Sequence, residues 1–264
     1  MARIDVPLSR LRFGETQRKD AWWVTPLIVF TVFTSFIVYA TWAAFQGNNY
    51  TYGPYLSPLY SPLLFSPDGH GWLGVRPTWI PGWITVAMLI LPFPGGFRLT
   101  CYYYRGAYYK AFWADPPSCA VGEPRKSYLG ERSFPLIIQN IHRYFMYAAV
   151  IFIGILGWDV IEAFRWMGAD GARHFGVGVG TIVMLVNVCL LASYTFGCHS
   201  LRHLVGGWMD KFSGHPVRKA AYDCVTACNG RHMLFAWCSL FSVALTDVYI
   251  RLCAMGIIHD VRIF

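Results

Sequence analysis

The sequence predicts an all-α integral membrane protein, a bundle of five transmembrane helices with a cytoplasmic N-terminus. Three observations lead to this fold class. The 264 residues are 55% hydrophobic and only 14% charged, a composition far from that of a soluble domain. Five stretches are apolar over about the 20 residues that a helix needs to cross a bilayer. Basic residues gather in alternate polar segments between those stretches.

The predicted helices cover residues 26–46, 79–100, 135–161, 176–198 and 232–256. We expect one transmembrane domain over 1–264, with a cytoplasmic leader at 1–25, the bundle at 26–256 and an outer tail at 257–264. No small-residue cleavage site follows a short apolar core, so we expect the leader to be retained. The segment NNYTYGPYLSPLYSPLLF is rich in Pro and Tyr. Proline interrupts helices and Tyr prefers the headgroup level, so we expect this segment to fold as a cap over the bundle.

The orientation follows from Lys and Arg, which are retained in cytoplasmic loops. Sixteen of them lie in the leader and in the segments 98–134 and 199–231, against five in the other polar segments. The N-terminus is therefore predicted to be cytoplasmic and the C-terminus to lie outside. This asymmetry also accounts for the net charge of +8. We expect no nucleic-acid partner, because no basic and aromatic recognition motif accompanies the charge.

The eight cysteines do not suggest a disulfide framework. Three of them lie within predicted helices, where a free Cys commonly serves as a small apolar residue. The other five fall on the reducing, cytoplasmic side: Cys101, Cys119, Cys198, Cys224 and Cys228.

Histidines on three helices reach the same cytoplasmic depth as these cysteines. His142 lies one or two turns into the third predicted helix from its cytoplasmic end, His203 follows the fourth and His232 begins the fifth. Facing helices of a bundle are where cofactor sites are built, and buried ionisable groups in a membrane are costly without a function. The combination predicts a metal or haem site.

The donor types narrow the choice of cofactor. Two haems would need paired histidines at both faces, and the outer side offers only loop and terminal ones. Two thiolates with two imidazoles match a Rieske-type 2Fe-2S cluster. A single haem b on two of the histidines is an alternative, and zinc accepts the same ligands without carrying electrons. The candidate ligands are two of the three cysteines and two of the three histidines in the set Cys101, Cys119, Cys198, His142, His203 and His232. Along one helical face, Cys224, Cys228 and His232 form a competing set.

Several motifs in order resemble a known family. They are FRLTCYYYRGAYYKAFW, PPSCAVGEP, QNIHRYFMYAA, GCHSLRHLVGGW, RHMLFAW and ALTDVYIRL. From about residue 95 onward the chain resembles the membrane-anchor subunit of succinate dehydrogenase found in actinobacteria and some other prokaryotes.

The resemblance implies an anchor in the bacterial inner membrane for flavoprotein and iron-sulfur subunits, with electrons passing from succinate to menaquinone. Further small membrane subunits and a higher oligomer are compatible with it. The chain has no dinucleotide fingerprint and no ferredoxin-like Cys series, so those partners would carry out succinate oxidation. The missing outer haem histidines depart from better-known five-helix anchors and favour a one-sided centre. The alternatives are a single-haem cytochrome b subunit and a non-redox scaffold or transporter subunit with a structural zinc.

Two further sites are predicted. Cations and aromatic faces at the cytoplasmic interface suit a quinone head group. The candidate residues are Arg98, Tyr102, Tyr103, Arg105 and Trp113. An interfacial aromatic belt is the alternative interpretation of these residues. In the outer half, Asp247, Asp159 and Glu162 are candidates for a proton relay. Asp247 and Arg251 stand at i and i+4, so a structural ion pair is the alternative there.

Overall fold

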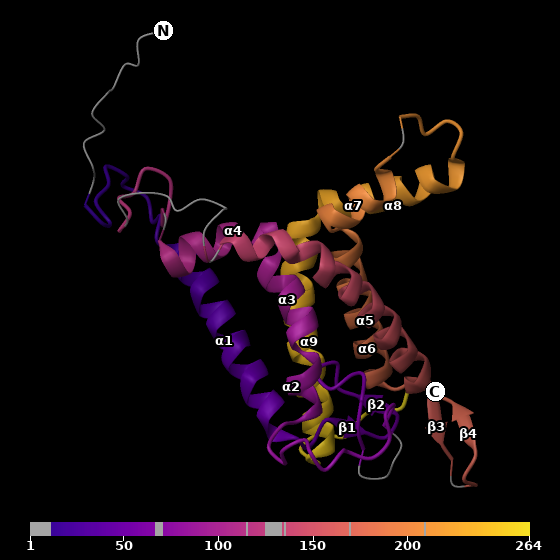
Figure 1. The fold of residues 1–264 in the computed structure, drawn as a ribbon. Coiled ribbons are helices and arrows are strands. Elements are labelled where there is room, and N and C mark those ends of the chain that lie inside the picture. The colour runs from indigo at the N-terminus through magenta and orange to yellow at the C-terminus, as the bar shows by residue number, and fades with distance from the viewer. Residues whose placement is uncertain are drawn as a thin grey trace, which may run out of the picture. The chain divides into compact units, whose positions relative to one another are not determined.

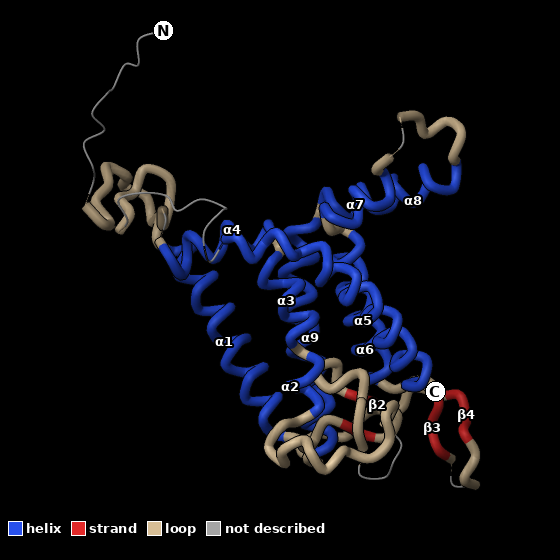
Figure 2. Tube along the Cα trace, in the orientation of Figure 1, coloured by secondary structure: helices blue, strands red, loops and turns tan. Residues whose placement is uncertain are grey.

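A computed structural model of the chain describes residues 12–66, 71–114, 116–124, 134, 136–168, 170–208 and 210–264. Their fold is drawn in Figure 1, and Figure 2 shows that it is mostly helical. The chain divides into two compact units, an N-terminal unit of Met1–Ser35 with Leu99–Asn140 and a main unit of Phe36–Arg98 with Ile141–Phe264. The single domain expected over 1–264 stays a prediction.

Four helices in the described part of the chain are long and apolar enough to cross a membrane. They are α1 (Val24–Gln46), α5 (His142–Ala163) extended by the 3-10 turn η2 (Leu136–Ile141), α6 (Val179–Phe196) and α9 (His232–Ala254). These four agree with the first, third, fourth and fifth predicted spans, and they confirm the mainly helical membrane fold.

The second predicted span, 79–100, is not confirmed as one helix. Residues 79–85 are non-helical, and two short helices follow, α2 (Val86–Ile90) and α3 (Pro92–Thr100). Pro92 and Pro94 have no backbone N–H, so the hydrogen-bond ladder is interrupted where α2 meets α3. The 15 residues from 86 to 100 rise about 22 Å at 1.5 Å per residue, less than the roughly 30 Å of a bilayer core.

Within the main unit, α6 packs against both α5 and α9. Two buried clusters hold the unit together. One joins Ala43 and Ala87 to Tyr60 and Val243, and the other joins Tyr55 to Val160 and Ile250. The buried aromatic residues of these clusters, Tyr60 and Tyr55, come from the cap, the segment 47–85 between α1 and α2.

The cap is folded, as predicted. Strands β1 (Thr51–Tyr52) and β2 (Tyr55–Leu56) pair antiparallel. The Tyr50 and Tyr60 rings stack 4.3 Å apart, and Tyr60 Oη donates to the Ala43 carbonyl at 2.8 Å. At Gly180 in α6 an added Cβ would lie 2.4 Å from the Tyr55 ring, so this glycine lets the cap approach the helix closely.

Four shorter elements extend from the two ends of the main unit. The helices α7 (His199–Gly206) and α8 (Pro216–Gly230) pack together at one end. Arg218 closes their turn by donating to the carbonyls of Val205 at 2.6 Å and Gly207 at 2.7 Å. The hairpin of β3 (Arg165–Met167) and β4 (Arg173–Phe175) lies at the other end, between α5 and α6 in the chain.

The N-terminal unit joins the first part of α1 to α4 (Tyr102–Tyr108) and the π-helix η1 (Tyr109–Trp113). Aromatic contacts form its interior, with Phe33 and Tyr104 ring centroids 5.0 Å apart. The leader folds onto residues 116–122, because Gly14 N donates to the Gly122 carbonyl at 2.9 Å and Arg18 Nη1 donates to Ser118 Oγ at 2.7 Å.

Candidate functional site

Three of the predicted ligands meet at one end of the main unit. His142 begins α5, Cys198 follows the end of α6, and His232 begins α9. These helix ends lie on the side of the unit that carries α7 and α8 (Figure 1). His142 Nε2 is 3.1 Å from Cys198 Sγ. These three side chains of the predicted set thus lie at the same end of the main unit.

Two aromatic rings support both imidazoles. The His142 ring stacks on Phe97 at 4.8 Å and an interplanar angle of 12°, and the His232 ring stacks on Tyr194 at 4.9 Å and 18°. Phe97 and Tyr194 are themselves 5.4 Å apart. These two residues were not among the predicted site residues. Each stands four positions before a candidate cysteine, Phe97 before Cys101 and Tyr194 before Cys198, and that shared spacing is a signal that points to them.

Gly197 places His232 beside Cys198. An added Cβ at Gly197 would lie 3.0 Å from His232 Nδ1, 2.9 Å from the Ser193 carbonyl and 3.0 Å from the Cys228 carbonyl. The Gly197–Cys198 segment is thus contacted by both imidazoles, with His142 at the sulfur and His232 at the glycine.

The other predicted ligands lie elsewhere. His203 is exposed on α7, with its ring 4.6 Å from that of His199; partial burial and the charges of His203 and Arg202 lower the pKa of His199. Cys101 is buried and Cys119 is exposed, both in the N-terminal unit. Of the competing set, Cys224 is exposed on α8. The described part of the chain holds no group of three or more His, Cys, Asp or Glu side chains arranged to bind a metal ion.

The five predicted quinone-site residues belong to both units. Arg98 ends the main unit, whereas Tyr102, Tyr103 and Trp113 belong to α4 and η1 of the N-terminal unit. The side chain of Arg105 lies outside the described residues. Arg98 is held within the main unit: its guanidinium is 4.6 Å from the Tyr194 ring centroid and donates to Ser239 Oγ at 2.7 Å and to the Ala236 carbonyl at 3.1 Å.

A cavity of about 500 Å³ begins at Arg98 and Tyr194. We call it the membrane pocket. Phe97 and Thr195 also line this end, and the remaining wall is almost wholly apolar, with Leu91, Phe152 and Leu156 among its residues. A pocket of this size, apolar with a few polar groups at one end, suits a ligand with a polar head and a hydrocarbon tail.

The carboxylates predicted for a proton relay have different surroundings. Asp247 is fully buried and forms an ion pair with Arg251 Nε at 2.7 Å. Tyr39 Oη donates to it at 2.5 Å, and Ser57 Oγ donates to its other oxygen. Arg251 also donates to the carbonyl of Asn48 at 3.0 Å. The predicted i, i+4 ion pair is therefore present, inside a satisfied network.

Asp159 and Glu162 differ from Asp247 in their partners. Asp159 on α5 is half-buried, and Ser61 Oγ is the one donor to its carboxylate among the described residues. Glu162 is partly exposed and pairs with Arg165 at 2.7 Å and Arg173 at 3.2 Å. Ser57 and Ser61, which sequence reasoning did not single out, each precede a proline in the cap.

The comparison with protein families decides which family the chain belongs to. The model of the actinobacterial succinate dehydrogenase subunit SdhC matches residues 24–256. The chain belongs to this family. A solved structure described as the Mycobacterium smegmatis Sdh1 complex in the apo form matches with a TM-score of 0.86 and 45% identity over 97% of each chain. A search of curated proteins gave no match.

The predicted resemblance is therefore confirmed. The chain is the membrane subunit of a succinate dehydrogenase complex, a multi-pass protein of the bacterial inner membrane and part of an oxidoreductase. The alternative of a non-redox scaffold or transporter subunit is not retained.

Proposed function

We propose that this anchor subunit passes electrons from the iron-sulfur partner of a succinate:quinone oxidoreductase, through a Cys/His-ligated centre on the cytoplasmic side, to menaquinone. The flavoprotein partner supplies the electrons from succinate. The observation that carries the proposal is the meeting of His142, Cys198 and His232 beside Phe97 and Tyr194, two residues that line the membrane pocket.

The residues present fit a Rieske-type 2Fe-2S centre. Such a centre takes two thiolates and two imidazoles and carries one electron at a potential useful for quinone chemistry. His142, His232 and Cys198 supply three donors from one end of the main unit. Two of the other predicted ligands, Cys101 and Cys119, belong to the N-terminal unit, so the fourth donor is not assigned. His203 is not chosen, since it is exposed on α7.

A single haem b between His142 and His232 has less support. Each imidazole packs face to face on an aromatic ring, and those two rings contact one another. A haem would have to displace Phe97 and Tyr194 from these contacts. The thiol of Cys198, 3.1 Å from His142, would have no role in it.

The membrane pocket is proposed as the menaquinone site. Arg98 would hold the quinone head through its cation and N–H donors, and Tyr194, whose ring contacts the Arg98 guanidinium, would line the pocket beside it. The apolar wall would accept the isoprenoid tail. Tyr194 also stacks on His232, so the quinone head and the proposed centre share one side chain. Of the predicted quinone residues, Arg98 keeps its place in this proposal.

Protons for menaquinone reduction are proposed to enter through Asp159. A carboxyl with one hydroxyl donor and no cation in contact among the described residues can take up and release a proton. Asp247 is less suited, because Arg251 and two hydroxyl donors already hold its carboxylate in a structural network. Glu162, near the surface with two arginines, would sit at the entrance.

The N-terminus is proposed to be cytoplasmic, and the basic cytoplasmic segments to dock the iron-sulfur subunit. This orientation places the His/Cys end of the main unit next to that partner. It also places the cap, with Ser57 and Ser61, on the outer side.

Electron paramagnetic resonance of the reduced, purified complex tests the centre. We expect a Rieske-like signal with a low average g value that disappears in His142→Ala and in His232→Ala. His203→Ala is the matched control, since its imidazole is exposed on α7, and it should keep the signal. Bis-imidazole haem absorption in the unmodified complex, without that signal, would establish the single-haem alternative.

A further inference from the structure

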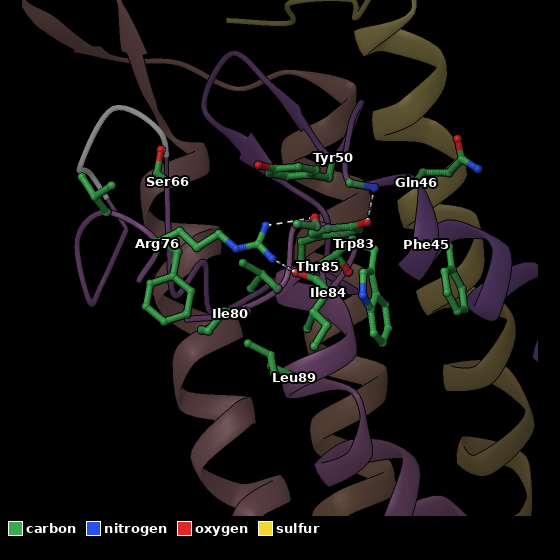
Figure 3. A pocket seen from close by; sticks show the side chains of 16 residues that line it. Phe45, Gln46, Tyr50, Ser66, Arg76, Ile80, Trp83, Ile84, Thr85 and Leu89 are labelled. Carbon is green, nitrogen blue, oxygen red and sulfur yellow. Dashed lines mark hydrogen bonds between the residues drawn. The ribbon is translucent and has the colours of Figure 1, made fainter. Parts of the chain in front are cut away.

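A second cavity, also of about 500 Å³, lies beside the cap (Figure 3). We call it the cap pocket. Its lining residues come from the end of α1, from the cap and from α2. Of the residues that line it, all within the described ranges, Arg76 is the one that carries a charge. The described lining of the cavity therefore carries a positive charge and no carboxylate.

Arg76 is fixed by the turn that leads into α2. Its Nη1 donates to the Gly82 carbonyl at 3.2 Å and its Nη2 to the Ile84 carbonyl at 2.7 Å, and Nη2 also contacts the Pro81 carbonyl. The guanidinium is thus oriented before any ligand arrives. The Nε–H of Arg76 has no hydrogen-bond acceptor among the described residues.

The position of the cap pocket matches a membrane–water boundary. Its residues Gln46 and Gly47 adjoin Asn48, whose carbonyl accepts a hydrogen bond from Arg251. Arg251 stands nineteen residues after His232 on α9, a rise of about 28 Å. That is nearly the whole hydrocarbon thickness, so the cap pocket and the His/Cys end lie at opposite boundaries.

From the loops toward the interior of the bilayer, the lining of the cap pocket changes from polar to apolar. Gln46, Ser66 and Arg76 lie at the level of the loops, whereas Val86 and Leu89 belong to α2. At the rim, Trp83 is 67% exposed, and exposed Trp is typical of the headgroup level.

We propose that the cap pocket binds the head group of an anionic phospholipid. Arg76 and the indole N–H of Trp83 supply donors for the phosphodiester oxygens, and an acyl chain lies along Phe45, Val86 and Leu89. In the proposed orientation the lipid belongs to the outer leaflet. A quinone is disfavoured here, because about 28 Å of α9 separates the cavity from His232, too far for direct electron exchange.

Native mass spectrometry of the detergent-purified complex tests the site, with phosphatidylglycerol and phosphatidylcholine of equal chain length as probes. We expect at least about tenfold tighter binding of the anionic lipid. Arg76→Gln removes the cation, and Leu89→Trp fills the cavity while leaving the Arg76 hydrogen bonds intact. Both variants should lose the preference, and Arg76→Lys should keep part of it if the loop is folded. The control Arg173→Gln, an outer arginine outside this cavity, should bind like the unmodified complex.

Equal binding of the two lipids by the unmodified complex would overturn the proposal, as would unchanged binding by Leu89→Trp. Displacement of bound phosphatidylglycerol by a short-chain naphthoquinone would assign the cavity to quinone instead. The readout is lipid binding, so its failure leaves the proposed electron route untouched.

Discussion

Gly197→Ala is a sharp test of where His232 acts. The added Cβ would lie 3.0 Å from Nδ1 of His232, whereas carbon contacts settle at about 3.5 Å or more. The added Cβ would also lie 2.9 Å from the Ser193 carbonyl and 3.0 Å from the Cys228 carbonyl. The imidazole and the backbone around it must therefore shift by about half an ångström, which is the tolerance within which functional sites must be held. The φ of Gly197 is −74°, so the substitution brings no backbone strain of its own.

Overpacking of this kind costs about 1–3 kcal/mol, or roughly 5- to 150-fold in the equilibrium between loaded and empty sites. We expect the Rieske-like signal and succinate-to-quinone turnover to fall together in Gly197→Ala. Succinate oxidation with a soluble dye acceptor should stay intact, because a soluble acceptor would bypass the proposed centre.

Gly154→Ala is the matched control. Gly154 lies in α5, and an added Cβ would meet nothing within 4 Å. This variant should keep the signal and gain about 0.5–1 kcal/mol of helix stability. A full signal and full quinone turnover in Gly197→Ala would refute the placement of the His232 imidazole on the centre.

Three further outcomes are expected. Asp159→Asn should slow succinate-to-quinone turnover in energised membranes while dye reduction persists. Asp247→Asn should lower both activities, because an unpaired buried Arg251 costs about 3–5 kcal/mol of stability. Equal behaviour of the two variants would contradict the assignment of proton transfer to Asp159 and of a structural role to Asp247. Gly96→Ala should raise the KM for quinone, because the added Cβ would lie 2.3 Å from the Phe145 ring and displace α3 together with Arg98. An unchanged KM would mean that Arg98 is not part of the quinone site. Charge reversal of the four basic residues Arg105, Lys110, Arg125 and Lys126 should release succinate dehydrogenase activity from membranes, and activity that stays bound would argue against docking there.

The sequence predicts the four long helices well because hydropathy alone determines them. Successive helices cross the membrane in opposite directions. The sequence could therefore also place His142, Cys198 and His232 at one end of the bundle. The second span shows the limit of hydropathy. Residues 79–100 are apolar enough, but Pro92 and Pro94 interrupt the hydrogen-bond ladder and the loop before α2 is held by Arg76.

Side-chain packing was beyond the reach of the sequence. Nothing in an apolar run says that Phe97 and Tyr194 lie under the imidazoles, because stacking depends on how helices rotate about their axes. His203 was grouped with the other histidines on depth, but α6 ends at Phe196 and α7 carries His203 to an exposed position. For the same reason the hydroxyl donors to Asp159 and Asp247 were not foreseen.

The two serines of the cap have a consequence for biogenesis. Ser57 donates to a carboxylate 190 residues later in the chain, on the last helix, and Ser61 donates to one 98 residues later, on α5. During synthesis the cap emerges early but has neither acceptor until those helices arrive in the membrane. We expect the cap to stay open to proteases throughout insertion and to close when α9 is in place, so that cap closure marks a finished subunit.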